Sequence, residues 1–277
     1  MTILTIFSTK APNMAEEFDV PAGYVSSLFD IKGRVAVVTG AGSGLGAAIA
    51  QGFSQAGVTV ILADINDDGM AHTLATITAQ DGRAIAHHLD VTQRADCFAL
   101  AAAVRDEHGR IDILVNSAGT AFRSPAETFP EDKLDFILDL NLKGTYFCCQ
   151  AFGAAMLEQG KGAIINIASI GSFVGYPWAS AYLASKGGVL QITKGLALEW
   201  RDRGVRVNGI GPTLMDSPMT RAAAATSITA DFIKARMLRP RMGLPREVVG
   251  AAIFLASDAS DLVTGHVVMC DDGYLIA

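Results

Sequence analysis

The sequence contains few charged residues and no basic stretch. Charged residues occupy 18% of the 277 positions, and 28 aspartates and glutamates outnumber 22 lysines and arginines. Binding to nucleic acid or to an anionic membrane surface depends on clustered lysine and arginine side chains. The formal charge of -6 therefore argues against both kinds of partner.

Long hydrophobic segments are absent as well, although 50% of the residues are hydrophobic. No apolar run approaches the roughly 20 residues that a membrane-spanning helix needs. The apolar start, residues 1–7, is short and lacks the positive charges of a secretory signal. We therefore expect a cytoplasmic protein with no membrane span.

Cysteine is scarce, and the complete set is Cys97, Cys148, Cys149 and Cys270. No pair has the CxxC spacing typical of zinc sites. Adjacent residues such as Cys148 and Cys149 suit neither a structural disulfide nor a zinc site. We expect reduced thiols packed in a core, and no bound metal.

From residue 34 onward, short apolar runs alternate with longer amphipathic segments. Seven runs are apolar at successive positions, as in strands buried on both faces; they are 35–39, 58–63, 84–89, 111–115, 163–168, 205–210 and 267–270. Between them, stripes such as Leu45, Ile49 and Phe53 are typical of helices. This alternation predicts an α/β fold: a doubly wound parallel sheet of about seven strands with helices on both faces.

One domain is expected over residues 31–277, because no linker or break in composition divides them. Residues 1–30 differ from this pattern. They contain Pro12, Pro21 and Gly23 and a small acidic cluster. We expect an N-terminal arm that is extended or partly disordered.

The first predicted strand leads directly into a glycine-rich segment, TGAGSGLG, at residues 39–46. Glycines permit a tight turn and the close approach of a pyrophosphate, and the N-terminus of the following helix attracts negative charge. The sequence therefore predicts a dinucleotide site in which Gly40, Ser43, Gly44 and Leu45 contact the cofactor.

The second predicted strand is followed by Asp64, 18 residues after Gly46. A carboxylate at this position accepts hydrogen bonds from the ribose of NAD and repels the 2′-phosphate of NADP. Ile65 follows it, and no basic residue lies nearby in the sequence. NAD is therefore favoured, with a simple loop acid or helix cap as the alternative role for Asp64.

Three further residues form a candidate catalytic group. Tyr182 and Lys186 stand four positions apart, which places them on one face of a helix. A lysine ammonium stabilises a phenolate and lowers the pKa of the tyrosine. Ser169 follows the fifth predicted strand, at the carboxyl end of the sheet where open α/β folds bind ligands.

Together with NSAG at 116–119 and NLKG at 141–144, these motifs resemble the short-chain dehydrogenase/reductase family over residues 33–277. The resemblance implies a Rossmann-type enzyme that transfers a hydride between NAD(H) and a secondary alcohol or ketone. It implies that Tyr182 is the general acid/base, that Ser169 binds the substrate oxygen, that Lys186 binds the nicotinamide ribose, and that Asn141 holds a relay water. The remaining cofactor contacts that it implies are Asp90, Val91, Asn116, Ala118, Gly119, Tyr182, Lys186, Pro212 and Met215.

Three residues depart from the family pattern. Ser117 stands where many relatives have a second asparagine, and we expect little effect. Thr213 replaces the usual glycine after Pro212, so we expect an altered path for the loop over the nicotinamide. Asp272 replaces a glycine near the C-terminus, and the sequence offers no account of this change.

A small-molecule alcohol or ketone is the expected substrate. The opening LFDIKG at 28–33 is similar to that of sugar-acid and polyol dehydrogenases of the family, and also to that of its 3-oxoacyl reductases. Pocket candidates are Thr120, Phe122, Ile170, Ser172, Tyr176, Trp178 and the segment 213–241. The alternatives are an NADPH-dependent 3-oxoacyl-carrier-protein reductase and a catalytically silent dinucleotide sensor or scaffold.

The family resemblance also implies an assembly. The helices expected near residues 142–152 and 182–200 carry more apolar surface than one sheet face covers, and the tail at 274–277 is apolar. We expect a homotetramer with two kinds of two-fold interface, and a dimer through the helices alone is the alternative.

Overall fold

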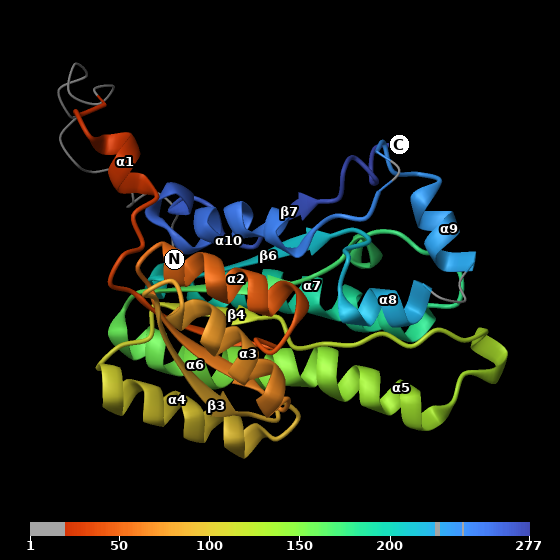
Figure 1. Cartoon of the computed structure of the whole chain (residues 1–277), viewed down its shortest axis with the longest axis horizontal. Coiled ribbons are helices and arrows are strands. Elements are labelled where there is room, and N and C mark those ends of the chain that lie inside the picture. The colour runs from red at the N-terminus through yellow and green to blue at the C-terminus, as the bar shows by residue number, and fades with distance from the viewer. Residues whose placement is uncertain (1–19, 225–227, 240) are drawn as a thin grey trace, which may run out of the picture.

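The computed structural model describes residues 20–224, 228–239 and 241–277. Seven parallel strands form one sheet in the order β3-β2-β1-β4-β5-β6-β7 (Figure 1). Their bounds are β1 Val35–Thr39, β2 Thr59–Asp64, β3 Arg83–His88, β4 Ile113–Asn116, β5 Gly162–Ile167, β6 Val205–Pro212 and β7 Val267–Cys270. The prediction of a Rossmann-type, doubly wound α/β fold is confirmed.

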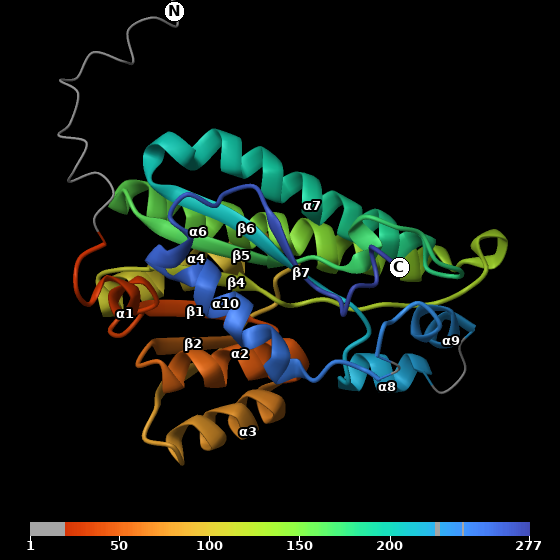
Figure 2. The same ribbon diagram turned by 90° about the horizontal axis from the view of Figure 1, so that it is seen from above.

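Helices cover both faces of the sheet (Figure 2). One layer holds α2 (Gly44–Gln55), α3 (Asp67–Thr78) and α10 (Val249–Ala256), and the other holds α4 (Arg94–His108), α6 (Thr145–Gln159) and α7 (Ser180–Trp200). Three shorter helices, α5 (Glu131–Ile137), α8 (Pro218–Ala224) and α9 (Ile228–Lys234), complete the list of those that bear on the site.

Successive strand residues belong to different cores, which explains the unbroken apolar runs. Val35 and Val37 of β1 pack with α4, α6 and α7, whereas Ala36 and Val38 pack with α2 and α10. Side chains of a strand alternate between the two faces of a sheet, so both sets must be apolar here. The edge strand β3 differs, because its residues are exposed or half-buried.

The sheet reverses its winding between β1 and β4, which are neighbours in it. The chain after β1 and the chain after β4 therefore separate at this point and leave a crevice at the carboxyl ends of the strands. Gly40 has a φ of +66°, and a Cβ there would lie 2.8 Å from the amide nitrogen of Ala118. A glycine is thus required where the two loops meet.

The N-terminal arm lies mostly outside the described residues, since residues 1–19 are not among them. Within its described part, Tyr24–Leu28 forms the short helix α1, which buries none of its residues, rather than extended chain. The core begins at Ile31, which is 1% exposed. The division at residue 30 stays a prediction. No helix in the described ranges is long and apolar enough to cross a membrane.

Candidate active site

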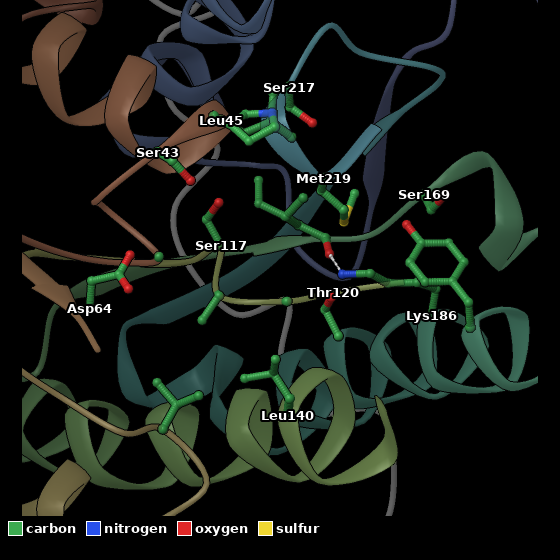
Figure 3. Close-up of a pocket in the computed structure, with 18 of the residues that line it drawn as sticks. Ser43, Leu45, Asp64, Ser117, Thr120, Leu140, Ser169, Lys186, Ser217 and Met219 are labelled. Atoms are coloured by element: carbon green, nitrogen blue, oxygen red, sulfur yellow. Dashed lines mark hydrogen bonds between the residues drawn. The ribbon is translucent and has the colours of Figure 1, made fainter. Parts of the chain in front are cut away.

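A cleft of about 420 Å³ runs along the carboxyl ends of the strands. Figure 3 shows Asp64 at one end and Ser169 at the other, and we call these the Asp64 end and the Ser169 end. Every predicted cofactor residue except Asn116 lines the cleft, and Ser169 does so too. The structure therefore brings together motifs that lie far apart in the sequence.

The glycine loop forms the wall between the two ends. Ser43 is the N-cap of α2, has extended backbone, and makes no capping hydrogen bond through its side chain within the described residues. The first amides of α2 therefore stay available to a ligand at a helix N-terminus. A Cβ at Gly46 would collide with the backbone of Gly40. This cradle of amides without side chains fits the pyrophosphate of a dinucleotide.

At the Asp64 end, two backbone amides hold the carboxylate of Asp64. Its Oδ2 accepts a hydrogen bond of 2.8 Å from the Gly42 amide, and its Oδ1 accepts one of 2.9 Å from the Asn66 amide. A Cβ at Gly42 would lie 3.0 Å from Oδ2. Among the described residues that line the cleft, Lys186 is the only basic one, and it stands at the Ser169 end.

Asp90 and Val91 form the next part of the wall, after β3. The Asp90 Oδ1 accepts hydrogen bonds from the amide and the hydroxyl of Thr92, at 2.9 and 2.7 Å. Val91 packs closely on Gly144, where a Cβ would lie 2.7 Å from the Val91 Cγ2. The Asp90 carboxylate is therefore held by the turn in which it lies, and Thr92, which no sequence motif marks, also lines the cleft.

Asn116 is not among the residues that line the cleft, and its contact with the cofactor stays a prediction. It is 4% exposed, and its Nδ2 donates 2.9 Å to the Asn166 Oδ1. As the last residue of β4, it turns its side chain toward the neighbouring strand β5. The loop that follows is held instead by Thr39, whose Oγ1 accepts hydrogen bonds from the amides of Ser117 and Ala118.

Asn141 also lies behind the lining, within a π-helical turn at Leu138–Gly144. Its Oδ1 accepts 2.8 Å from the Thr120 amide, and its Nδ2 donates to the Thr120 carbonyl and to the Ser185 hydroxyl. The side chain thus ties the wall at Thr120 to helix α7. Such π turns often occur at functional sites, and the sequence pattern alone did not reveal this one.

Tyr182 and Lys186 lie on α7, near its N-terminus, as the four-residue spacing predicts. The Lys186 Nζ donates 2.6 Å to the Ile167 carbonyl, drawn as a dashed line in Figure 3, and lies 6.0 Å from the Tyr182 ring centroid. Burial lowers the pKa of Lys186 to about 8. This amine therefore titrates much closer to neutral pH than an ordinary lysine.

The pKa of Tyr182 reflects opposing effects. Burial raises it above the ordinary value, while hydrogen bonding to Ser169 and the positive charge of Arg123 lower it. Arg123 is thus a cation that lowers the pKa of this hydroxyl. No motif marks Arg123 in the sequence, because it lies in the irregular loop that follows Gly119.

Arg123 stacks over Tyr176, with its guanidinium carbon 5.9 Å from the ring centroid. Its Nε and Nη1 are buried and have no hydrogen-bond acceptor within the described residues. Burial raises the pKa of Tyr176, and hydrogen bonding to Ser169 lowers it. Arg123 and Tyr176 therefore form a polar group behind the Ser169 end.

Of the predicted pocket candidates, Thr120 and the first part of the segment 213–241 line the cleft, whereas Phe122, Ile170, Ser172, Tyr176 and Trp178 are not among its lining residues. The lining residues of that segment are Thr213, Met215, Ser217, Pro218, Met219 and Thr220. The lining also includes residues that the motifs did not indicate. Among them are Leu89, Phe136, Asp139 and Leu140. They come from a loop, from α5 and from the π turn, whose positions depend on packing rather than on local sequence.

Comparison with known proteins agrees with this geometry. Residues 40–275 match the family described as enoyl-(acyl carrier protein) reductase. A D-threitol dehydrogenase from Mycolicibacterium smegmatis is 41% identical over 268 residues, which are 97% of this chain and 99% of that protein. An NAD-dependent glycerol dehydrogenase from Listeria innocua is 38% identical over 250 residues, which are 90% of this chain and 96% of that protein.

A solved structure shares the fold. The gluconate 5-dehydrogenase from Burkholderia cenocepacia, in complex with NADP and tartrate, has a TM-score of 0.86 and 34% identity, covering 91% of this chain and 99% of that one. The names of these relatives do not favour the 3-oxoacyl-carrier-protein reductase alternative. Because the likeness extends over almost the whole chain, the protein belongs to the short-chain dehydrogenase/reductase family and is an oxidoreductase of alcohol and carbonyl groups.

Proposed function

We propose that the protein is an NAD-dependent dehydrogenase of a polyhydroxylated secondary alcohol, a polyol or a sugar acid. The observation that carries the cofactor choice is the Asp64 carboxylate, which two backbone amides hold at the cleft wall. A fixed negative charge repels a 2′-phosphate, and no cation lines that end of the cleft among the described residues. The relatives divide on this point, because one is named NAD-dependent and another holds NADP.

The chain's own residues would orient the reactants and move one proton. The cofactor, when bound, supplies the hydride acceptor for the carbinol hydrogen. Amides of residues 43–45 would hold its phosphates, and Asp64 would hold its adenosine ribose. In the oxidative direction the Tyr182 hydroxyl group, as phenolate, takes the proton of the substrate hydroxyl, and Ser169 hydrogen-bonds the same oxygen. Asn141 keeps its proposed place in the proton relay.

The charges around Tyr182 support its role as the base. A tyrosine with an ordinary pKa near 10 is protonated at neutral pH and needs nearby cations to ionise. Arg123 acts on it already, and the Lys186 ammonium lies 6.0 Å from its ring. We propose that Lys186 adds its charge to that of Arg123 while binding the nicotinamide ribose.

Polar groups at the Ser169 end favour a substrate that carries several oxygens. Thr120 and Ser169 line the cleft there. Behind them, Arg123 has two buried N–H groups without an acceptor in the described part of the chain. Buried donors are normally hydrogen-bonded, because an unmade bond costs free energy. A hydroxyl or carboxylate of the substrate would supply acceptors. Because a guanidinium binds a carboxylate especially well, Arg123 specifically favours a sugar acid as the substrate.

A substrate panel tests this function. Purified protein is mixed with C3–C6 polyols and sugar acids, with NAD and NADP in parallel, and reduced cofactor is followed by absorbance. We expect turnover of at least one secondary alcohol, with a higher kcat/KM for NAD. Turnover with NADP alone would overturn the cofactor proposal. Tight NADH binding with no turnover of any alcohol would support the silent sensor instead.

We also propose a homotetramer in the cytoplasm. Large apolar side chains stay exposed on α5, α6 and α7 and at the C-terminus: Leu134, Phe136, Tyr146, Leu198 and Ile276. Patches of this kind are often covered by another subunit. Light scattering should give about four times the chain mass of 29.0 kDa. A dimer would keep only the helical interface, and a monomer would contradict the assembly.

A further inference from the structure

Asp272, which departs from the family pattern, has an unusual backbone conformation. Its φ is +53°, in the left-handed region that glycine adopts freely and that most other residues avoid. The usual glycine at this position would take this conformation without strain. Aspartate tolerates this region better than most residues, so its contacts rather than its conformation must show what the side chain does.

The Asp272 carboxylate binds a segment that is distant in the sequence. Its Oδ2 accepts 2.6 Å from the Arg239 backbone amide, and its Oδ1 accepts 2.6 Å from the Arg239 Nε. The next residue adds a packing contact, because a Cβ at Gly273 would lie 2.6 Å from the Leu238 Cδ1. The turn after β7 therefore holds residues 238 and 239 by both polar and apolar contacts.

Residues 231–239, which we call the α9 segment, pack against residues beside the Ser169 end of the cleft, among them Ile170 and Tyr182. Both Figure 1 and Figure 2 show α9 on the same side of the molecule as the C-terminus. Ile233 and Met237 are 2% and 8% exposed and pack in one cluster with Tyr176 and Leu214. A Cβ at Gly171 would lie 2.9 Å from the Tyr176 hydroxyl oxygen, and the Gly171 amide donates a hydrogen bond to the Ser169 Oγ. A continuous set of contacts thus leads from Asp272 to the group that would bind the substrate oxygen.

Asp272 and Arg239 also line a second cavity of about 350 Å³. Thr213 and Met215 line both this cavity and the cofactor cleft. The loop that would cover the nicotinamide therefore has the Asp272–Arg239 pair behind it. Release of Arg239 would loosen the outer wall of the Ser169 end and leave the Asp64 end untouched.

We propose that Asp272 is a positioning residue, which fixes the α9 segment beside the Ser169 end of the cleft by holding the amide and the guanidinium of Arg239. Its kinetic consequence rests on the proposed function, and its structural consequence does not. An exposed ion pair alone contributes little. The backbone amide bond is what distinguishes this pair, since it restrains the chain itself.

Asp272→Gly is the direct test, because glycine suits the left-handed conformation and removes only the carboxylate. Asp81 supplies a matched control: its φ is +58°, and its side chain makes no hydrogen bond that the structure records among described residues. Asp81→Gly therefore removes the same charge and the same strain far from the cleft. Asp272→Asn keeps an oxygen acceptor for the Arg239 amide and serves as the rescue variant.

Hydrogen–deuterium exchange of the full-length protein reads the restraint without any substrate. We expect exchange across the α9 segment to rise about tenfold in Asp272→Gly, and to stay at the wild-type rate in Asp81→Gly. Asp272→Asn should recover most of the protection. Unchanged exchange in Asp272→Gly overturns the proposal, whatever the activity of the enzyme.

Steady-state kinetics measure how the loss of this restraint affects the reaction. With an alcohol that the wild type oxidises, Asp272→Gly should raise KM about fivefold and change kcat less than about twofold, as expected for a lost restraint of this size. NADH affinity, set largely at the Asp64 end, should not change. Faster exchange with unaltered KM would overturn the positioning role. If exchange is faster in Asp272→Gly but the wild-type protein oxidises no alcohol, the structural role of Asp272 is supported and the proposed function is rejected.

Discussion

The Asp64 end of the cleft is built from backbone, whereas the Ser169 end is built from side chains of separate loops. Gly42, Asp64 and Asn66 lie within one stretch of chain, and amide hydrogen bonds join them. Arg123 and Tyr176, in contrast, come from segments that follow β4 and β5, and Met237 and Asp272 come from two further segments.

This difference distinguishes the cofactor site, which follows from the shared fold, from the substrate site, whose loops can differ from one relative to another. A dinucleotide is the same molecule for every relative, so a site made of strand ends and helix N-termini serves them all. Loops tolerate substitution more readily than the elements they connect, and they carry most specificity. We therefore expect changes at the Asp64 end to alter cofactor choice, and changes at the Ser169 end to alter substrate choice.

The largest expected effect lies where the two ends meet, at the reacting hydroxyl. Tyr182→Phe keeps the ring and removes the proton carrier, so kcat should fall by about 10³, within the range for general acid/base groups. NADH affinity, measured by fluorescence, should stay within about twofold of wild type. Near-normal turnover in the folded variant would reject Tyr182 as the acid/base. The Ser169 end could then no longer be taken as the place where the reaction occurs.

The next effect sharpens the account of the Asp64 end. The double variant Asp64→Ala/Ile65→Arg removes a like charge and adds a bidentate phosphate partner, so both changes favour NADP. The ratio of kcat/KM for NADP over NAD should rise by about 10², with the KM of the alcohol substrate almost unchanged. A shift in alcohol KM as large as the shift in cofactor preference would contradict the independence of the two ends.

A change at Lys186 tests whether burying its ammonium group at the Ser169 end lowers the free energy of unfolding. The pKa of this lysine is about 8 in the folded chain, against 10.5 for the ordinary group. The unfolded chain therefore binds the proton more tightly, and stability falls as the pH decreases from 10.5 to 8 and stays at the lower level below. The difference corresponds to about 3 kcal/mol, of which the hydrogen bond to Ile167 returns about 1 kcal/mol.

Lys186→Met should therefore be inactive and yet about 2 kcal/mol more stable than wild type at pH 7. Its advantage should shrink as the pH rises from 8 toward 10.5, because the wild-type amine then becomes neutral. Denaturant unfolding at a series of pH values measures both. Equal stability of the two proteins at pH 7 would show that the buried ammonium carries no such cost.

The sequence predicted the Asp64 end well because each part of it is local. Unbroken apolar runs mark the strands, and the residues that follow them stand at one edge of the sheet. The exception is instructive: Asn116 ends β4, but its side chain turns to Asn166 of β5 instead of the cleft. Which side a strand-end residue faces depends on where its neighbours lie, and the motif does not state this.

The Ser169 end was predictable only for residues with a motif. Ser169, Tyr182 and Lys186 have one, whereas Arg123 has none, because its role depends on Tyr176, more than 50 residues later. Asp272 was recognised as a departure, but its account required the position of Arg239, which no spacing rule gives. Long-range contacts between loops carry no periodic signal in a single sequence.

Substitution of Arg123 should have the smallest of these effects, and it is the most direct test of which kind of substrate the protein binds. Arg123→Met keeps the length and apolar volume of the stem while removing the guanidinium. If that group binds a carboxylate, KM should rise about tenfold for sugar acids and less than about twofold for polyols. Arg94 offers a control, because it also stacks over an aromatic ring, that of Phe98 at 4.5 Å, while its Nε already donates a hydrogen bond to the Gln150 Oε1. Arg94→Met should leave both KM values unchanged. Because Arg123 lowers the pKa of Tyr182, the lost positive charge should also shift the pH profile of kcat toward higher pH. Equal increases in KM for acids and polyols would contradict a direct contact between Arg123 and a substrate carboxylate.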